Sequence, residues 1–145
     1  MLLHSPIVII VCDFKNHNLI KILAESFSQS KVVAEELPIK GLTNPSYVTV
    51  NNNDELIVVD GAEVKTFNQK YECLHQFTLS EHSFIKPSCI AVDDNNLLAV
   101  GHYNQCDYLC LGLYKPDGSL IRTLPTSGVS DYLTIHKQQL IYTLG

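Results

Sequence analysis

Three residues in the second half of the chain, His102, Cys106 and Cys110, could bind a metal ion and stand four positions apart. Zinc prefers imidazole and thiolate ligands of this kind. A spacing of four, however, aligns side chains on a helix, whereas this segment is expected to run from a loop into a strand. Cys106 and Cys110 then share one strand face, where a buried cysteine packs as a small apolar residue. The pattern therefore predicts no metal site.

The carboxylates suggest turns rather than catalysis. Asp93 and Asp94 are adjacent, but the Asp-x-Asp-x-Asp-Gly pattern of a calcium loop does not follow them. Asp13 and Asp60 each end an apolar run, and we expect them to cap the turns that come next. The chain has no Gly-x-Ser-x-Gly, phosphate-loop or His-Glu-x-x-His motif, the patterns that anchor nucleophilic, nucleotide and zinc-hydrolase chemistry. We expect no catalytic residue and no cofactor.

The composition is that of a globular module with an acidic balance. Of 145 residues, 46% are hydrophobic and 17% are charged, which excludes a disordered or fibrous chain. Ten Lys and Arg residues face fifteen Asp and Glu residues, for a net charge of −5, and Arg122 is the single arginine. Nucleic-acid binding needs excess cationic surface. A nucleic-acid partner is therefore not expected.

The cysteines and the N-terminal apolar run bear on the compartment. Five cysteines are an odd number without the rhythm of a disulfide framework, which favours free thiols in a reducing environment. The run at residues 7–12 has no Lys or Arg before it and has only the length of a strand. We expect a cytoplasmic protein with no membrane association.

A repeat of 42 residues is the strongest pattern in the chain. Residues 45–53 read Pro-Ser-Tyr-Val-Thr-Val-Asn-Asn-Asn, and residues 87–95 read Pro-Ser-Cys-Ile-Ala-Val-Asp-Asp-Asn. Each window leads into a second apolar run, at 56–59 and at 97–100, and a weaker third copy begins at residue 132. A period of about 40–45 residues made of short strands is typical of β-propeller blades.

The expected strands number four in each complete repeat. Turn-forming residues at 51–54, 93–96 and 115–118 separate the strands, and several strands are apolar on both faces, as in a sheet covered on both sides. Serines and paired valines within residues 23–36 favour a loop and an outer strand over a helix. The fold class is therefore all-β, with blades of four antiparallel strands. The expected strands are 47–50, 56–59, 63–67 and 71–79 in one repeat, and 88–92, 97–100, 108–114 and 119–124 in the next.

The segment from Ile9 to Ile22, an apolar strand ending in Asp13, a loop carrying Asn16 and His17 and a second apolar strand, resembles the NHL-repeat consensus. The two Pro-Ser windows resemble the opening strand of that repeat. In the copy after Asp60, Gly101 stands for the Asp and residues 102–105 lengthen the loop. The resemblance implies a six-bladed propeller, often the substrate- or RNA-binding part of tripartite-motif ubiquitin ligases.

Against six blades the chain is incomplete. It is expected to hold a partial blade at 6–37, complete blades at 45–79 and 87–124 and a partial blade at 130–145, about three of six. Open blade faces and strand edges invite pairing with another chain. We expect the chain on its own to be insoluble or to self-associate.

The loops that join strands two and three, and those between blades, are expected to form a rim that binds a protein or peptide partner. The function expected is therefore a protein-interaction module, as in the recognition arm of a ubiquitin ligase. The resemblance leaves two alternatives, a gluconolactonase-like metal-dependent hydrolase and an RNA-binding domain. The rim candidates are Asn16, His17, His82, Phe84, Lys86, His102 and Tyr103.

The repeat also predicts a core between neighbouring blades. We expect Val92→Asp to unfold its blade, because an unpaired buried carboxylate costs several kcal/mol. The core residues expected are Val48, Val50, Ile57, Val59, Ile90, Val92, Leu98 and Val100.

Overall fold

The protein is built from four separate antiparallel β-sheets. The computed structural model describes residues 7–24, 32–79, 86–103, 109–126 and 129–144, and within these ranges it has thirteen strands and no helix. Each sheet is open at both edges, and its strands follow one another in chain order. The expectation of an all-β fold of antiparallel strands is confirmed.

The four sheets differ in size, with three strands in the first, four in the second and third, and two in the fourth. The first sheet contains β1 (Ile7–Asp13), β2 (Asn18–Ala24) and β3 (Val32–Glu36). The second contains β4 (Pro45–Val50), β5 (Leu56–Asp60), β6 (Glu63–Phe67) and β7 (Cys73–Thr78). The third contains β8 (Lys86–Val92), β9 (Leu98–Tyr103), β10 (Leu109–Tyr114) and β11 (Leu120–Pro125). The fourth contains β12 (Val129–His136) and β13 (Gln139–Leu144).

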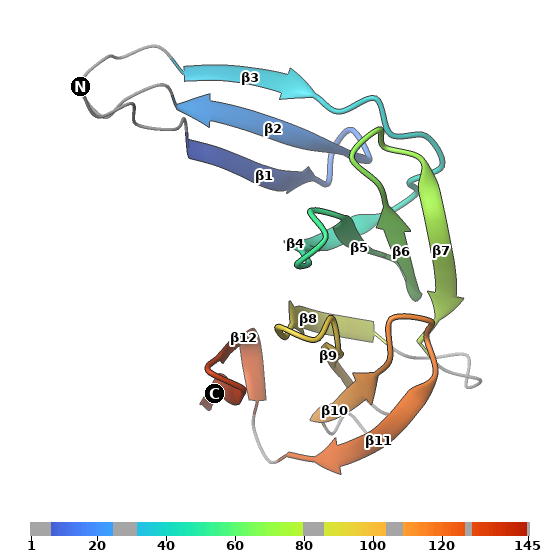
Figure 1. The fold of residues 1–145 in the computed structure, drawn as a ribbon, viewed down its shortest axis with the longest axis vertical. Coiled ribbons are helices and arrows are strands. Elements are labelled where there is room, and N and C mark those ends of the chain that lie inside the picture. Colours follow the sequence, from blue (N-terminus) through green and yellow to red (C-terminus); the bar gives the residue numbers. More distant parts are fainter. Residues whose placement is uncertain (1–6, 25–31, 80–85, 104–108, 127–128, 145) are drawn as a thin grey trace.

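The sheets follow one another around an arc (Figure 1). Strands β1, β4, β8 and β12 lie toward the inside of the arc, and β3, β7 and β11 lie on its outside. The inner strands contact one another in sequence, β1 with β4, β4 with β8 and β8 with β12. Neighbouring sheets therefore meet most closely at their inner strands.

The second and third sheets repeat the same register at a distance of 42 residues. Pro45 pairs with Asp60 and Pro87 pairs with His102, and in both sheets a β-bulge follows the proline. His102, not Gly101, therefore occupies the position of Asp60, and the expected alignment was wrong by one residue. The apolar run of the third sheet starts at Leu97, but this residue closes the turn, where its N–H bonds the Asp93 side chain at 2.7 Å.

The second sheet is buried on both faces, as its apolar pattern predicted. Leu56 and Val58 of β5 pack toward the first sheet, in a cluster with Leu19 and Phe67. The alternate residues of β5 pack toward the third sheet. That second cluster contains Ile57, Val59, Val64, Leu79, Ile90, Leu98, Val100 and Tyr114. A strand between two sheets has no solvent face, so both parities must be apolar.

The predicted core is correct except at the end of β4. Five of the eight residues are buried, and Val48 and Val92 are partly buried and pack against the clusters. Val50 is 46% exposed, which corrects the prediction for this residue. It is the last residue of an inner strand, and its side chain lines a groove rather than an inter-sheet interface.

The predicted turns form with the expected backbone chemistry. Asp54 and Asn96 occupy matching turn positions with φ of 56° and 62°, a region that Asn and Asp tolerate. Gly118 has φ of 88° and lies so close to the Phe77 ring that a Cβ would clash with it. The doubtful segment 23–36 ends in the outer strand β3, as expected.

Candidate functional site

The turn between β1 and β2 carries the first two rim candidates. The backbone N–H groups of Lys15 and Asn16 donate to Asp13 Oδ1 at 3.1 and 3.2 Å, and Asn16 Nδ2 donates to Asp13 Oδ2 at 2.7 Å. The hydrogen bonds from Asn16 hold the pKa of the Asp13 carboxyl below its ordinary value of 3.8. Asp13 therefore caps its turn as predicted. His17 follows, exposed and with φ of 55°.

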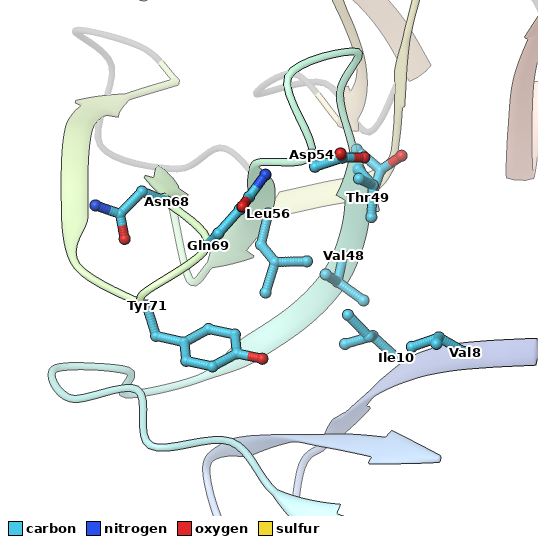
Figure 2. A pocket seen from close by; sticks show the side chains of 10 residues that line it. Val8, Ile10, Val48, Thr49, Asp54, Leu56, Asn68, Gln69 and Tyr71 are labelled. Atoms are coloured by element: carbon cyan, nitrogen blue, oxygen red, sulfur yellow. The ribbon is translucent and has the colours of Figure 1, made fainter. Parts of the chain in front are cut away.

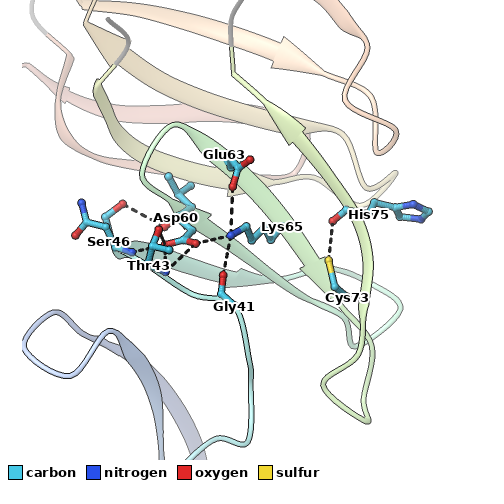
Figure 3. Close-up of polar contacts among 10 residues, drawn as sticks. Gly41, Thr43, Ser46, Asp60, Glu63, Lys65, Cys73 and His75 are labelled. Atoms are coloured by element: carbon cyan, nitrogen blue, oxygen red, sulfur yellow. Dashed lines mark hydrogen bonds and ion pairs between the residues drawn. The ribbon is translucent and has the colours of Figure 1, made fainter. Parts of the chain in front are cut away.

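Asp60 does not cap the turn after its strand, which corrects the prediction. Its carboxylate accepts hydrogen bonds from the backbone N–H groups of Thr43 and Asn44 and from Lys65 Nζ, the last at 2.6 Å (Figure 3). Lys65 Nζ also donates to the Gly41 carbonyl at 2.9 Å. Because β5 is buried on both faces, the carboxylate finds its donors in the connection between the first and second sheets. The pair fastens residues 41–44 to the second sheet.

The ion pair between Asp60 and Lys65 is almost fully enclosed, with side-chain exposures of 0% and 9%. Burial raises the pKa of Asp60, but the hydrogen bonds from Lys65, Asn44 and Thr43 outweigh it and hold that pKa below 3.8. Burial lowers the pKa of Lys65, and the bonds to Asp60 and Glu63 reverse this and raise it above 10.5. Both groups stay charged at neutral pH, so neither serves as a proton donor or acceptor.

His102 takes the position of Asp60 in the third sheet and is only 6% exposed. Its Nδ1 atom has no hydrogen-bond partner in the described part of the chain. Burial lowers the pKa of the imidazole below 6.5, against a hydrogen bond with the Val100 backbone that acts in the opposite direction. His102 is thus a buried neutral residue, which corrects its assignment to an exposed rim.

The remaining rim candidates are described only in part. Tyr103 is partly exposed at the end of β9 and pairs with Lys86, whose backbone begins β8. The side chain of Lys86 and the whole of His82 and Phe84 lie outside the described residues. Asn16 belongs to the first sheet and Tyr103 to the third, with the second sheet between them (Figure 1). The described rim candidates do not meet in one site.

A groove of about 400 Å³ lies between the first and second sheets, at the opposite end of the strands from Asp13 and Asp60. Its apolar wall comes from the inner strands β1 and β4, where Val8 is 49% exposed and Val50 is 46% exposed. Figure 2 shows these aliphatic side chains between Tyr71 at one end and Asp54 at the other. The lining residues are Val8, Ile10, Val48, Thr49, Val50, Asp54, Leu56, Asn68, Gln69 and Tyr71.

The polar edge of this groove comes from two turns. Asn68 holds the β6–β7 turn through hydrogen bonds from its side-chain amide to Glu72 and to its carbonyl from Lys70 N–H. Tyr71 adopts φ of 64° at the end of that turn. The arrangement can receive an apolar side chain and offer a carboxylate and amides to its polar neighbours. Within the described ranges, no three metal-binding side chains gather.

Sequence reasoning missed this groove because its walls are more than thirty residues apart in the chain. A smaller hollow of about 270 Å³ separates the third and fourth sheets. At the junction between them, by contrast, the second and third sheets are tied together by their turns. Asn52 N–H donates to Asn96 Oδ1 at 3.0 Å, and Asn52 Nδ2 donates to the Asp94 carbonyl. Such cross-sheet bonds have no local sequence signature.

Cys12 lies on the inner side of the first sheet, where burial raises the pKa of its thiol from 9.0 to about 11. At pH 8 this leaves roughly a hundredfold less thiolate than an ordinary thiol has. We expect iodoacetamide to label exposed Cys73 well before Cys12, measured by peptide mass spectrometry over time. Labelling of both residues at one rate in the folded chain would contradict the burial of Cys12.

Within the described ranges, no helix has the length and apolarity needed to cross a membrane. Comparison of the chain with protein-family models and with curated protein sequences finds no match in either set.

Proposed function

We propose that the chain is a segment of an NHL-like β-propeller and acts as a protein-interaction module. Three observations support the propeller. The second and third sheets share one register at 42 residues, their strands run in chain order from inside to outside, and the inner strands contact one another around the arc. Blades arranged around an axis have these properties.

The observation that carries the binding role is the groove between β1 and β4. Exposed valines in a concave site are typical of a surface that is covered when a partner binds. Asp54 at its edge and the net charge of −5 favour a partner segment with basic residues beside an apolar side chain. We propose that an extended peptide of this kind is the ligand. In a larger protein, such a module would serve as the arm that recognises a substrate.

Selection from a random peptide library on the immobilised chain tests this function. We expect the selected peptides to pair an apolar residue with Lys or Arg. Val50→Lys should weaken their binding about tenfold or more, because it places a cation in the apolar wall and repels the basic ligand. Leu74→Lys on outer strand β7 is the matched control, since Leu74 is similarly exposed at 41% and lies outside the groove.

Three results would contradict the proposal. Peptides that bind wild type and Val50→Lys equally, but lose affinity with His17→Ala, would move the site from the groove to the rim. Metal-dependent hydrolysis of a lactone by the chain would make it an enzyme. Tight, salt-sensitive binding of RNA in a filter assay would replace the peptide with a nucleic acid.

A further inference from the structure

The first sheet has one apolar face that no other sheet of the described chain covers. Val11 pairs with Ile20 and Ile9 pairs with Ile22, so these four side chains share a face. The alternate residues of β1 pack toward the second sheet. Ile9 and Val11 are 48% and 37% exposed, and Ile7 on the same face is 41% exposed. We call the side chains of Ile7, Ile9, Val11, Ile20 and Ile22 the open face.

The strand pairing shows which residues hold the same positions in the other sheets. The second and third strands of each complete sheet, and β1 with β2, end in equivalent pairs, Asp13 with Asn18, Asp60 with Glu63 and His102 with Cys110. Equal steps back from these pairs identify the counterparts of the open face. They are Leu56 and Leu98 for Ile9, Val58 and Val100 for Val11, and Phe67 and Tyr114 for Ile22.

All six counterparts are buried, with exposures of 5% or less, and they belong to the two clusters between sheets. In each case the face receives the opposite face of the preceding sheet along the arc. Leu19 supplies that contact between the first and second sheets, and Val64 supplies it between the second and third. The open face therefore has the residue pattern of a sheet-to-sheet interface and lacks the sheet that would cover it.

The fourth sheet presents the complementary face at the other end of the arc. Ile135 pairs with Leu140, and both line the hollow beside the third sheet. The next residue, Ile141, points to the other face and is 49% exposed. Ile141 follows Leu140 as Ile57 follows Leu56 at the start of β5, and Ile57 packs against the third sheet. One chain thus carries an uncovered donor face and an uncovered acceptor face.

We infer that a second copy of this chain covers the open face, in a head-to-tail contact. The face around Ile141 of one copy packs on the face around Ile9 and Val11 of the next, by the same apolar sheet packing that joins the sheets within a chain. A second copy is the occupant because both halves of the interface are present in each molecule. Heterologous contacts of this kind build rings or chains of subunits.

Two single variants and their mixture test this contact in the 145-residue chain. Ile9→Lys removes the acceptor face and Ile141→Lys removes the donor face, and both sites are exposed enough for the variants to fold, which far-UV circular dichroism checks. Light scattering after size exclusion should show wild type above monomer mass and dissociating on dilution. Each variant should be monomeric, with self-association weakened about tenfold or more.

The mixture distinguishes head-to-tail packing from other modes. An equimolar mixture of the two variants should form a dimer and nothing larger, because one intact pair of faces remains. Leu120→Lys, at a 55% exposed residue of outer strand β11, should associate like wild type. A wild-type chain that stays monomeric at high concentration would overturn the inference, and so would a mixture that stays monomeric. Peptide binding is not part of the readout, so this result is independent of the proposed function.

Discussion

Val100→Asp is expected to abolish the cooperative unfolding transition of the second and third sheets. Val100 is fully buried in β9, within the cluster that joins these sheets. An unpaired carboxylate there costs several kcal/mol, a large share of a total stability of about 5–15 kcal/mol. Thermal unfolding followed by far-UV circular dichroism measures the loss, since the chain has no tryptophan to report by fluorescence.

Two other valines set the scale for this experiment. Val92→Asp, which the sequence predicted to unfold its blade, should destabilise the chain less than Val100→Asp, because Val92 is only partly buried at the end of β8. Val50→Asp should leave the transition nearly unchanged, because Val50 is 46% exposed. Equal melting temperatures for Val100→Asp and Val50→Asp would show that the second and third sheets do not pack through this cluster.

Asp60→Asn is expected to lower the free energy of unfolding by about 3 kcal/mol, the cost of breaking a buried ion pair while one charge stays enclosed. Lys65 would keep its bond to Gly41 and its 3.2 Å contact with Glu63, but would lose the partner at 2.6 Å (Figure 3). Asp60→Asn combined with Lys65→Met should recover part of the loss, because no uncompensated charge remains. Urea denaturation of the three chains measures both effects.

The stability difference between wild type and Asp60→Asn should depend on pH in a defined direction. The pKa of Asp60 is lowered on folding, so its contribution is complete above 3.8 and disappears as the pH falls through the folded value. The pKa of Lys65 is raised, so its contribution is complete below 10.5 and disappears as the pH rises through the folded value. The difference should therefore be constant around neutral pH and vanish in acid. Asp117→Asn, at an exposed turn, should show a smaller effect, and a Asp60→Asn difference that persists unchanged in strong acid would contradict the buried pair.

The strands and turns of this protein could be predicted from the sequence because their causes are local. The turns at Asn51 and Asp93 need side chains that accept backbone hydrogen bonds and residues that tolerate positive φ, and both are visible within five positions. The burial of β5 on both faces likewise follows from its uninterrupted apolar residues. These features require no knowledge of what lies beyond the neighbouring strand.

Register, partners and exposure were decided by tertiary structure. A single residue in a turn moves a whole strand by one position, so only the pairing shows that His102 stands where Asp60 does. The donors to Asp60 come from a connection sixteen residues and more away, and Val50 borders a groove because β1 of another sheet lies opposite. Burial and polar contacts between sheets depend on which surfaces meet, and residues distant in the chain determine those surfaces. Local patterns therefore specify the sheets, and the packing of sheet on sheet specifies the groove, the ion pair and the open face.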